Sequence, residues 1–193
     1  MTSPPQLILA SASPRRKELL MQLKLHAVVH PVDLDETPLP GEPPLAYVQR
    51  LAAEKSALCA SLSDADLPIL AADTAVVLDD WIMGKPNSKE DCISMLSRLS
   101  GKTHQVFCAV SLRGKRHGQA VSITDVTFRH IAEQEIEAYW RTGEPADKAG
   151  GYAIQSLGSL FVAAIKGSYS GVVGLPLFET AELLLKEGIE VLT

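Results

Sequence analysis

The stretch LPILAADTAVVL, residues 67–78, is apolar except for one ionisable residue, Asp73. A short apolar run with no polar face predicts a strand buried in a sheet. An unpaired carboxylate is costly to bury, so Asp73 is expected to be neutral, ion-paired or bound to a metal. The alternative is an aspartate at the end of the strand that hydrogen-bonds to a turn.

The part of the chain before residue 67 is predicted to alternate strands and helices. QLILASASPRRKELLMQL (residues 6–23) predicts a strand over 7–11 and a helix that begins at Ser13 and Pro14. The segments that follow are a strand over 26–32, a loop rich in proline and acid over 33–44, and a helix over 45–62.

After residue 88 the predicted strands follow one another more closely in the sequence. We expect a helix from Ser88 to Gly101, a hairpin or meander of strands 105–112 and 119–131, and a helix over 133–142. Glycine-punctuated strand and loop over 150–174 and a final helix over 175–188 should follow. This order predicts an α/β or α+β fold, one domain over residues 1–193, with a mixed curved sheet. The glycine-rich segment is expected to line a cleft between two lobes.

The composition narrows the classes of partner. The chain has 193 residues and a net charge of -5, which argues against a broad nucleic-acid surface. The N-terminus lacks the basic region of a signal peptide, and the apolar stretch 149–165 is too short to span a membrane, so we expect a cytoplasmic protein. Cys59, Cys92 and Cys108 show no ligand spacing and are expected to be reduced thiols.

Two arginines stand where cations are unfavourable. Arg15 and Arg16 fall in the first turn of the predicted helix, where the positive end of the helix dipole suits an anion. Guanidinium groups bind phosphate bidentately, although they could equally pair with carboxylates elsewhere. Ser13 is expected to cap the helix, and Ser11 could direct its hydroxyl at the same anion.

Further charged residues extend this pattern. Lys55 interrupts the apolar stripe of the helix over 45–62, and it either reaches solvent or joins a phosphate pocket to which Lys85 could also contribute. The acidic residues Asp33, Asp35 and Glu36, combined with Asp73, are hard oxygen ligands suited to Mg²⁺ or Mn²⁺. The sequence has neither the P-loop pattern nor the glycine-rich dinucleotide pattern.

Six ordered motifs together resemble the Maf family of nucleoside triphosphate pyrophosphatases. They are SASPRRKELL, the DE of DLDETP, AAEKSA, AADTAVVL, MGKP and DKAGGYAIQSLG. The resemblance implies an elongated curved mixed sheet similar to that of inosine triphosphate pyrophosphatases. It also implies hydrolysis of a nucleoside triphosphate to the monophosphate and pyrophosphate, a divalent cation and a homodimer.

Residue roles follow from the same resemblance. Asp73 would accept the proton of the attacking water or orient it with the metal, and Glu36 would be a metal-linked carboxylate. The phosphate contacts would be Ser11, Arg15, Arg16, Lys55 and Lys85. Arg15, Thr74 and Gln155 match the dTTP/UTP subgroup, and a glutamine amide can meet the alternating acceptors and donor of uracil and thymine.

Two alternative functions stay open. One is the same chemistry on 7-methyl-GTP or another modified nucleotide, and the other is a nucleotide-binding regulator of septum formation. The sequence does not rank dTTP, UTP, CTP and modified pyrimidines, or Mg²⁺ against Mn²⁺. It also leaves open whether the task is nucleotide pool sanitation or division control.

Overall fold

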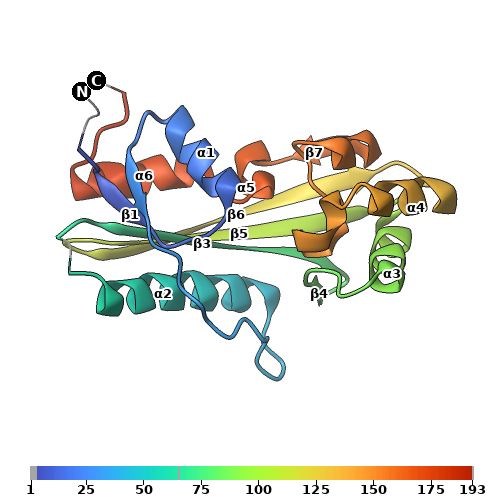
Figure 1. Ribbon diagram of the computed structural model, residues 1–193, viewed down its shortest axis with the longest axis horizontal. Helices are drawn as coiled ribbons and strands as arrows, with labels where there is room; N and C mark the ends of the chain where they lie inside the picture. The colour runs from blue at the N-terminus through green and yellow to red at the C-terminus, as the bar shows by residue number, and fades with distance from the viewer. Residues whose placement is uncertain (1–3, 65, 193) are drawn as a thin grey trace.

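The computed structural model describes residues 4–64 and 66–192 as a mixed sheet flanked by helices (Figure 1). The strand order is β2-β1-β3-β5-β6-β7, with β4 also paired to β3. The strands are β1 (Leu7–Leu9), β2 (Ala27–Val29), β3 (Ile69–Leu78), β4 (Trp81–Met83), β5 (Thr103–Arg113), β6 (His117–Phe128) and β7 (Val162–Lys166). The helices are α1 (Pro14–Gln22), α2 (Pro44–Leu62), α3 (Lys89–Leu99), α4 (Glu133–Arg141), α5 (Tyr169–Val173) and α6 (Leu177–Glu187).

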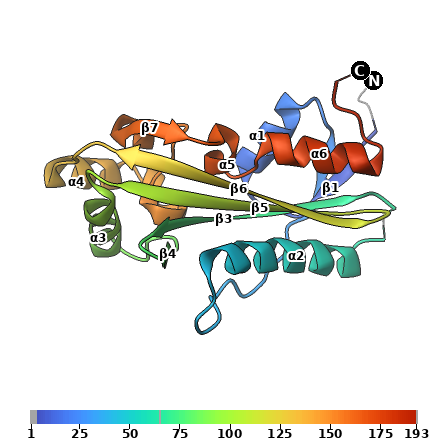
Figure 2. The same ribbon diagram turned by 180° about the vertical axis from the view of Figure 1, so that it is seen from behind.

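The helices cover both faces of the sheet, which explains why β3 is apolar throughout. Helices α1, α5 and α6 lie on one face and α2 lies on the other, while α3 and α4 gather at the far end (Figures 1 and 2). A strand between two covered faces needs apolar side chains at successive positions. The prediction of a mixed α/β fold with a long buried strand is confirmed.

Among the long strands, the pairing of β5 with β6 was predicted and that of β5 with β3 was not. Strands β5 and β6 form an antiparallel hairpin, and β5 pairs along almost all of β3. The two parallel pairings involve the short strand β1, which pairs with β2 and with the beginning of β3.

The opposite edge of β3 is only partly paired, and this gap sets the position of the site. Strand β1 pairs with Ile69 and Leu70, and β4 pairs with residues 76–78. Within the described residues, neither short strand pairs with residues 71–75. Because side chains alternate along a strand, Asp73 and Thr74 in this gap point to opposite faces of the sheet.

The helix starts show where local chemistry and tertiary structure compete. The Ser88 hydroxyl accepts a hydrogen bond from the Asp91 amide, so the predicted cap of α3 is confirmed. The prediction that Ser13 caps α1 through its side chain was wrong. Its own amide donates to the Ser11 hydroxyl, which also accepts from Arg16.

The glycine-punctuated segment 150–174 holds more structure than strand and loop. It contains part of the 3-10 turn Ala149–Gly151, a second 3-10 turn over Leu157–Phe161, then β7 and the short helix α5. The 3-10 turn Glu144–Asp147 precedes it. Hydrophobic periodicity does not detect such short turns. Cys59, Cys92 and Cys108 are free and buried.

Gly150 joins this segment to the sheet, and its replacement is expected to destabilise the fold. Its φ is +66°, and a Cβ there would lie 2.9 Å from Val76 Cβ. Gly150→Ala should lower the free energy of unfolding by about 2 to 4 kcal/mol, since backbone strain adds to overpacking. Gly101 has a similar φ of +70°, but a Cβ there would meet no other atom of the described residues. Gly101→Ala should therefore lower the free energy of unfolding by only about 1 kcal/mol. Equal losses in urea unfolding would show that the Val76 contact is unimportant.

Candidate active site

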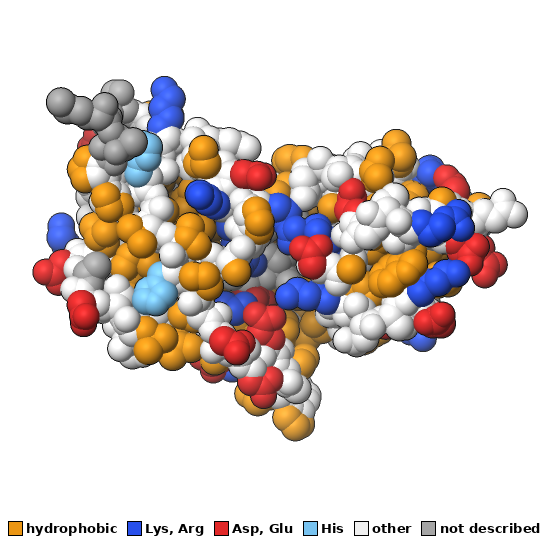
Figure 3. Space-filling view, in the orientation of Figure 1, with side chains coloured by type: hydrophobic (Ala, Val, Ile, Leu, Met, Phe, Trp, Pro, Cys, Tyr) orange, Lys and Arg blue, Asp and Glu red, His pale blue; other side chains and the backbone are white. Residues whose placement is uncertain are grey.

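A cleft of about 340 Å³ opens beside the unpaired edge of β3. Figure 3 shows the molecule hollowed near its middle, with basic and acidic side chains around the opening. The sequence-predicted residues that line the cleft are Ser11, Arg15, Arg16, Glu36, Lys55, Asp73, Thr74, Lys85 and Gln155. Residues from distant parts of the chain therefore line one cleft.

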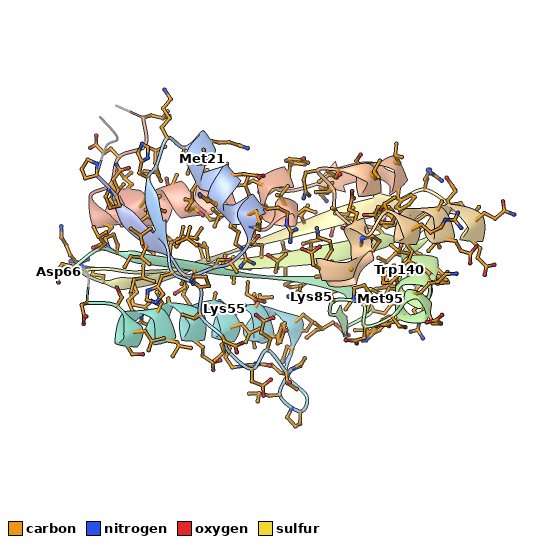
Figure 4. All side chains as sticks on the ribbon, viewed as in Figure 1. Met21, Lys55, Asp66, Lys85, Met95 and Trp140 are labelled. Atoms are coloured by element: carbon orange, nitrogen blue, oxygen red, sulfur yellow. The ribbon has the colours of Figure 1, made fainter. Side chains whose placement is uncertain are left out.

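Lys55 links the two carboxylates of the site. Its Nζ lies 2.7 Å from Asp73 Oδ1 and 2.5 Å from Glu36 Oε1. Lys55 is buried on α2, the helix that packs on the face of β3 from which Asp73 projects. Its pairing with the two carboxylates explains why a lysine interrupts the apolar stripe of α2. Figure 4 shows Lys55 and Lys85 near the middle of the molecule, between its two ends.

Burial and nearby cations oppose each other at these carboxylates. Burial raises the pKa of Asp73, and the charges of Lys55 and Arg16 offset only part of this effect. At the more exposed Glu36, partial burial also acts to raise the pKa, but the hydrogen bond and charge of Lys55 outweigh it and the pKa is lowered. Asp73 is therefore the carboxyl with the greater affinity for a proton.

Arg16 approaches from the opposite face of the sheet. Its Nε donates to the Gly174 carbonyl at 2.8 Å, its Nη1 to the Ser11 hydroxyl at 3.2 Å and its Nη2 to the Thr74 hydroxyl at 3.4 Å. These neutral partners orient the guanidinium without cancelling its charge. Arg16 therefore keeps its positive charge beside the cleft.

Arg15 has a partner that sequence analysis missed. Its Nη1 lies 3.5 Å from Asp147 Oδ2, and Lys148 also forms an ion pair with Asp147. Asp147 and Lys148 both line the cleft. The only indication in the sequence was their place at the start of DKAGGYAIQSLG, because an exposed Asp-Lys pair is otherwise ordinary.

Lys85 and Gln155 face the same space from other segments. Among the described residues, neither side chain forms a hydrogen bond or an ion pair. Apolar lining lies nearby, including Val76, Val106 and Tyr152. The cleft thus offers cations for an anion together with apolar surface and a glutamine amide.

The acidic loop divides into residues inside and outside the cleft. Asp33 and Asp35 do not line it, and Asp35 instead accepts a hydrogen bond from the Thr37 amide at 2.9 Å. The Tyr47 hydroxyl donates to the Glu36 carbonyl at 2.9 Å. Glu36 is therefore the member of the acidic cluster that the fold directs to the site.

The carboxylates are suited to a divalent cation. They already hold the Lys55 ammonium between them, so this position favours positive charge. Mg²⁺ is usually bound through one or two carboxylates together with substrate phosphates. Glu36 and Asp73 fit this pattern; among residues 4–64 and 66–192, no group of three or more potential ligands is preassembled.

Comparison with known proteins agrees with these features. The sequence matches the family described as "Maf-like protein" over residues 6–187. Relatives named dTTP/UTP pyrophosphatase include that of Methylococcus capsulatus, 55% identical over 95% of this chain and 92% of the relative. Those of Saccharophagus degradans and Myxococcus xanthus are 52% and 50% identical, over 92% and 95% of this chain and 87% and 93% of theirs.

A solved structure of the Staphylococcus aureus Ham1 protein is also similar. It shares 18% identity and a TM-score of 0.46, covering 66% of this chain and 72% of the other.

Proposed function

The chain belongs to the Maf family, and on this premise we propose that it hydrolyses dTTP and UTP to the monophosphate and pyrophosphate. The observation that carries the proposal is the cleft, which joins a buried carboxyl, several cations and a free glutamine amide. Relatives that are 50% to 55% identical over nearly the whole chain bear that activity in their names.

Asp73 is the residue proposed to activate water. Its raised pKa makes it a better proton acceptor than an exposed aspartate. In the proposed reaction, Asp73 takes a proton from water as the water oxygen attacks the α-phosphorus, and the bond to the pyrophosphate oxygen breaks. Pyrophosphate leaves with the bonding electron pair.

The cations of the cleft are proposed to bind the phosphates. Lys85 has no ion-pair partner in the described part of the chain, and Arg16 is held by neutral oxygens, so both retain charge for substrate. Arg15 and Lys55 pair with carboxylates but also line the cleft. Fixed cations beside the leaving oxygens stabilise charge that develops in the transition state.

Glu36 and Asp73 would hold a divalent cation, Mg²⁺ or Mn²⁺, together with the substrate phosphates. When bound, such an ion neutralises phosphate charge and polarises the phosphoryl oxygens. Lys55 lies between the same two carboxylates and would keep them close together before the ion binds.

Gln155 and Thr74 are proposed to bear on the choice of base. The free Gln155 amide offers a donor and an acceptor to uracil or thymine. Thr74 supports Arg16 and also contacts Cys108 Sγ at 3.2 Å, so its proposed contribution acts through the position of the guanidinium.

The cellular setting is also a proposal. The described residues include no helix long and apolar enough to cross a bilayer. We propose a cytoplasmic homodimer that acts on free nucleotides rather than nucleic acid, in pool sanitation or division control.

Pyrophosphate release tests the proposed function. Purified protein with Mg²⁺ or Mn²⁺ is assayed on dTTP, UTP, CTP, ATP, GTP, ITP and 7-methyl-GTP. We expect dTTP and UTP to give the highest kcat/KM. Turnover confined to 7-methyl-GTP would retain the chemistry and reject the base assignment. Nucleotide binding without turnover would favour a nucleotide-binding regulator instead.

A further inference from the structure

The position of Gln155 depends on the backbone around it. The residue is exposed, and its side chain has no hydrogen-bond partner within the described residues. An unanchored side chain presents its amide reproducibly only if its main chain is fixed. The bonds on either side of Gln155 are therefore relevant to how a base would be recognised.

One carboxylate outside the cleft binds the chain that follows Gln155. Glu144 Oε2 accepts from the Ser156 hydroxyl at 2.6 Å and from the Leu157 amide at 3.2 Å. Its Oε1 accepts from the Gly158 amide at 3.0 Å. Three successive residues after Gln155 thus share one anchor.

The same carboxylate also reaches the chain that precedes Gln155. Glu144 Oε1 accepts from the Tyr139 hydroxyl at 2.7 Å, and that hydroxyl accepts from the Ala153 amide at 3.1 Å. Tyr139 is buried on α4. Glu144 is consequently linked to both sides of Gln155, with α4 as the rigid support.

Gly158 shows how tightly this loop closes. A Cβ at Gly158 would lie 2.7 Å from the Ala153 carbonyl oxygen and 2.8 Å from the Tyr139 hydroxyl. The loop before and after Gln155 is therefore packed backbone to backbone around these bonds.

Glu144 is well suited to act as an ionised anchor. Partial burial acts to raise its pKa, but hydrogen bonds from Ser156, Tyr139, Gly158 and Leu157 outweigh it and the pKa is lowered. Hydrogen bonds to a charged group are stronger than those between neutral groups.

We propose that Glu144 is a positioning residue for base recognition, which holds the Gln155 loop in the conformation that meets the pyrimidine. Glu144 does not line the cleft and would act only through Gln155. The inference rests on the proposed function, since it requires a pyrimidine nucleotide in the cleft. Glu144 would then affect base recognition without contacting the substrate.

A double-mutant cycle tests the proposal. Glu144→Gln replaces an acceptor oxygen by an NH₂ group that cannot accept from the loop. With UTP, we expect it to lower kcat/KM about tenfold, a change of 1.4 kcal/mol, through KM with kcat nearly unchanged. Gln155→Ala should lower kcat/KM at least as much. The double variant should match Gln155→Ala alone, because residues that act through one contact are not additive.

Two further variants make the result specific. Glu137→Gln removes a half-buried glutamate of α4 that pairs with Lys89 and does not line the cleft, and it should leave kcat and KM unchanged. Ser156→Ala removes one donor to Glu144 without changing charge, and it should raise KM for UTP about threefold. If thermal melting shows that the Glu144→Gln protein is unfolded, the KM of Ser156→Ala for UTP tests the proposal in its place.

The contrary results separate this inference from the proposed function. If Gln155→Ala raises KM for UTP while Glu144→Gln and Ser156→Ala do not, the positioning role is wrong and the function stands. Multiplicative losses in the double variant, or an equal fall of kcat on all nucleotides, would indicate a merely structural role. If the parent protein does not hydrolyse pyrimidine triphosphates, both proposals fail.

Discussion

Asp73→Asn should reduce pyrophosphate release from UTP by at least about 100-fold while the protein stays folded. Loss of a general base typically costs two to four orders of magnitude in rate. The asparagine side chain keeps the shape of the aspartate and can still accept a hydrogen bond from Lys55, which also retains its ion pair with Glu36. The loss should therefore appear in kcat rather than in thermal stability.

Asp33→Asn is the matched control for this variant. Asp33 belongs to the acidic loop but does not line the cleft, so its replacement should leave kcat unchanged. An Asp73→Asn protein with more than a tenth of the parental kcat would contradict the assigned role. Circular dichroism of both variants checks that the fold is retained.

Lys55→Met should produce the largest loss of stability together with a loss of activity. The substitution keeps an unbranched side chain of similar length but leaves Asp73 buried without its ammonium partner. Breaking a buried ion pair by removing one partner costs about 3 to 5 kcal/mol. Lys17→Met, at an exposed position of α1, should change the free energy of unfolding by less than about 0.5 kcal/mol.

The pH dependence of this loss provides a second check. Burial raises the pKa of Asp73 above its unfolded value, so the folded state binds the proton more tightly. Stability therefore falls as pH rises through the interval between the two pKa values. Without Lys55 the folded pKa rises further, which widens that interval. Urea unfolding should show a difference between parent and variant that shrinks toward pH 4; a difference independent of pH would contradict this account.

Much of the fold could be predicted because it depends on local patterns. The apolar run around Asp73 is the long strand β3, and the Ser88 cap and the β5–β6 hairpin are confirmed. Charged residues within apolar patterns also indicated where the site lies. Lys55 and Asp73 each interrupt an apolar pattern, and the structure pairs them.

The remaining features depend on contacts between distant segments. Ser13 stands at the N-cap of α1 as its sequence indicates, but its hydroxyl forms no capping bond, and its amide instead donates to the Ser11 hydroxyl. Charge alone could not distinguish Asp33 and Asp35 from Glu36, which only the family resemblance singled out, since Tyr47 and the course of the loop decide which carboxylate enters the cleft. Glu144 was not identified, because its role depends on four donors from Tyr139 and the loop over 156–158.

Hydrolysis of UTP in ¹⁸O-labelled water tests the central claim most directly. The reaction is run with Mg²⁺, the products are separated, and mass spectrometry measures the ¹⁸O content of UMP and of pyrophosphate. Attack of water on the α-phosphorus places one ¹⁸O atom in UMP and leaves the pyrophosphate unlabelled. Label in pyrophosphate would contradict attack at the α-phosphorus, and label in free phosphate, or the absence of any turnover, would contradict a nucleoside triphosphate pyrophosphatase at this cleft.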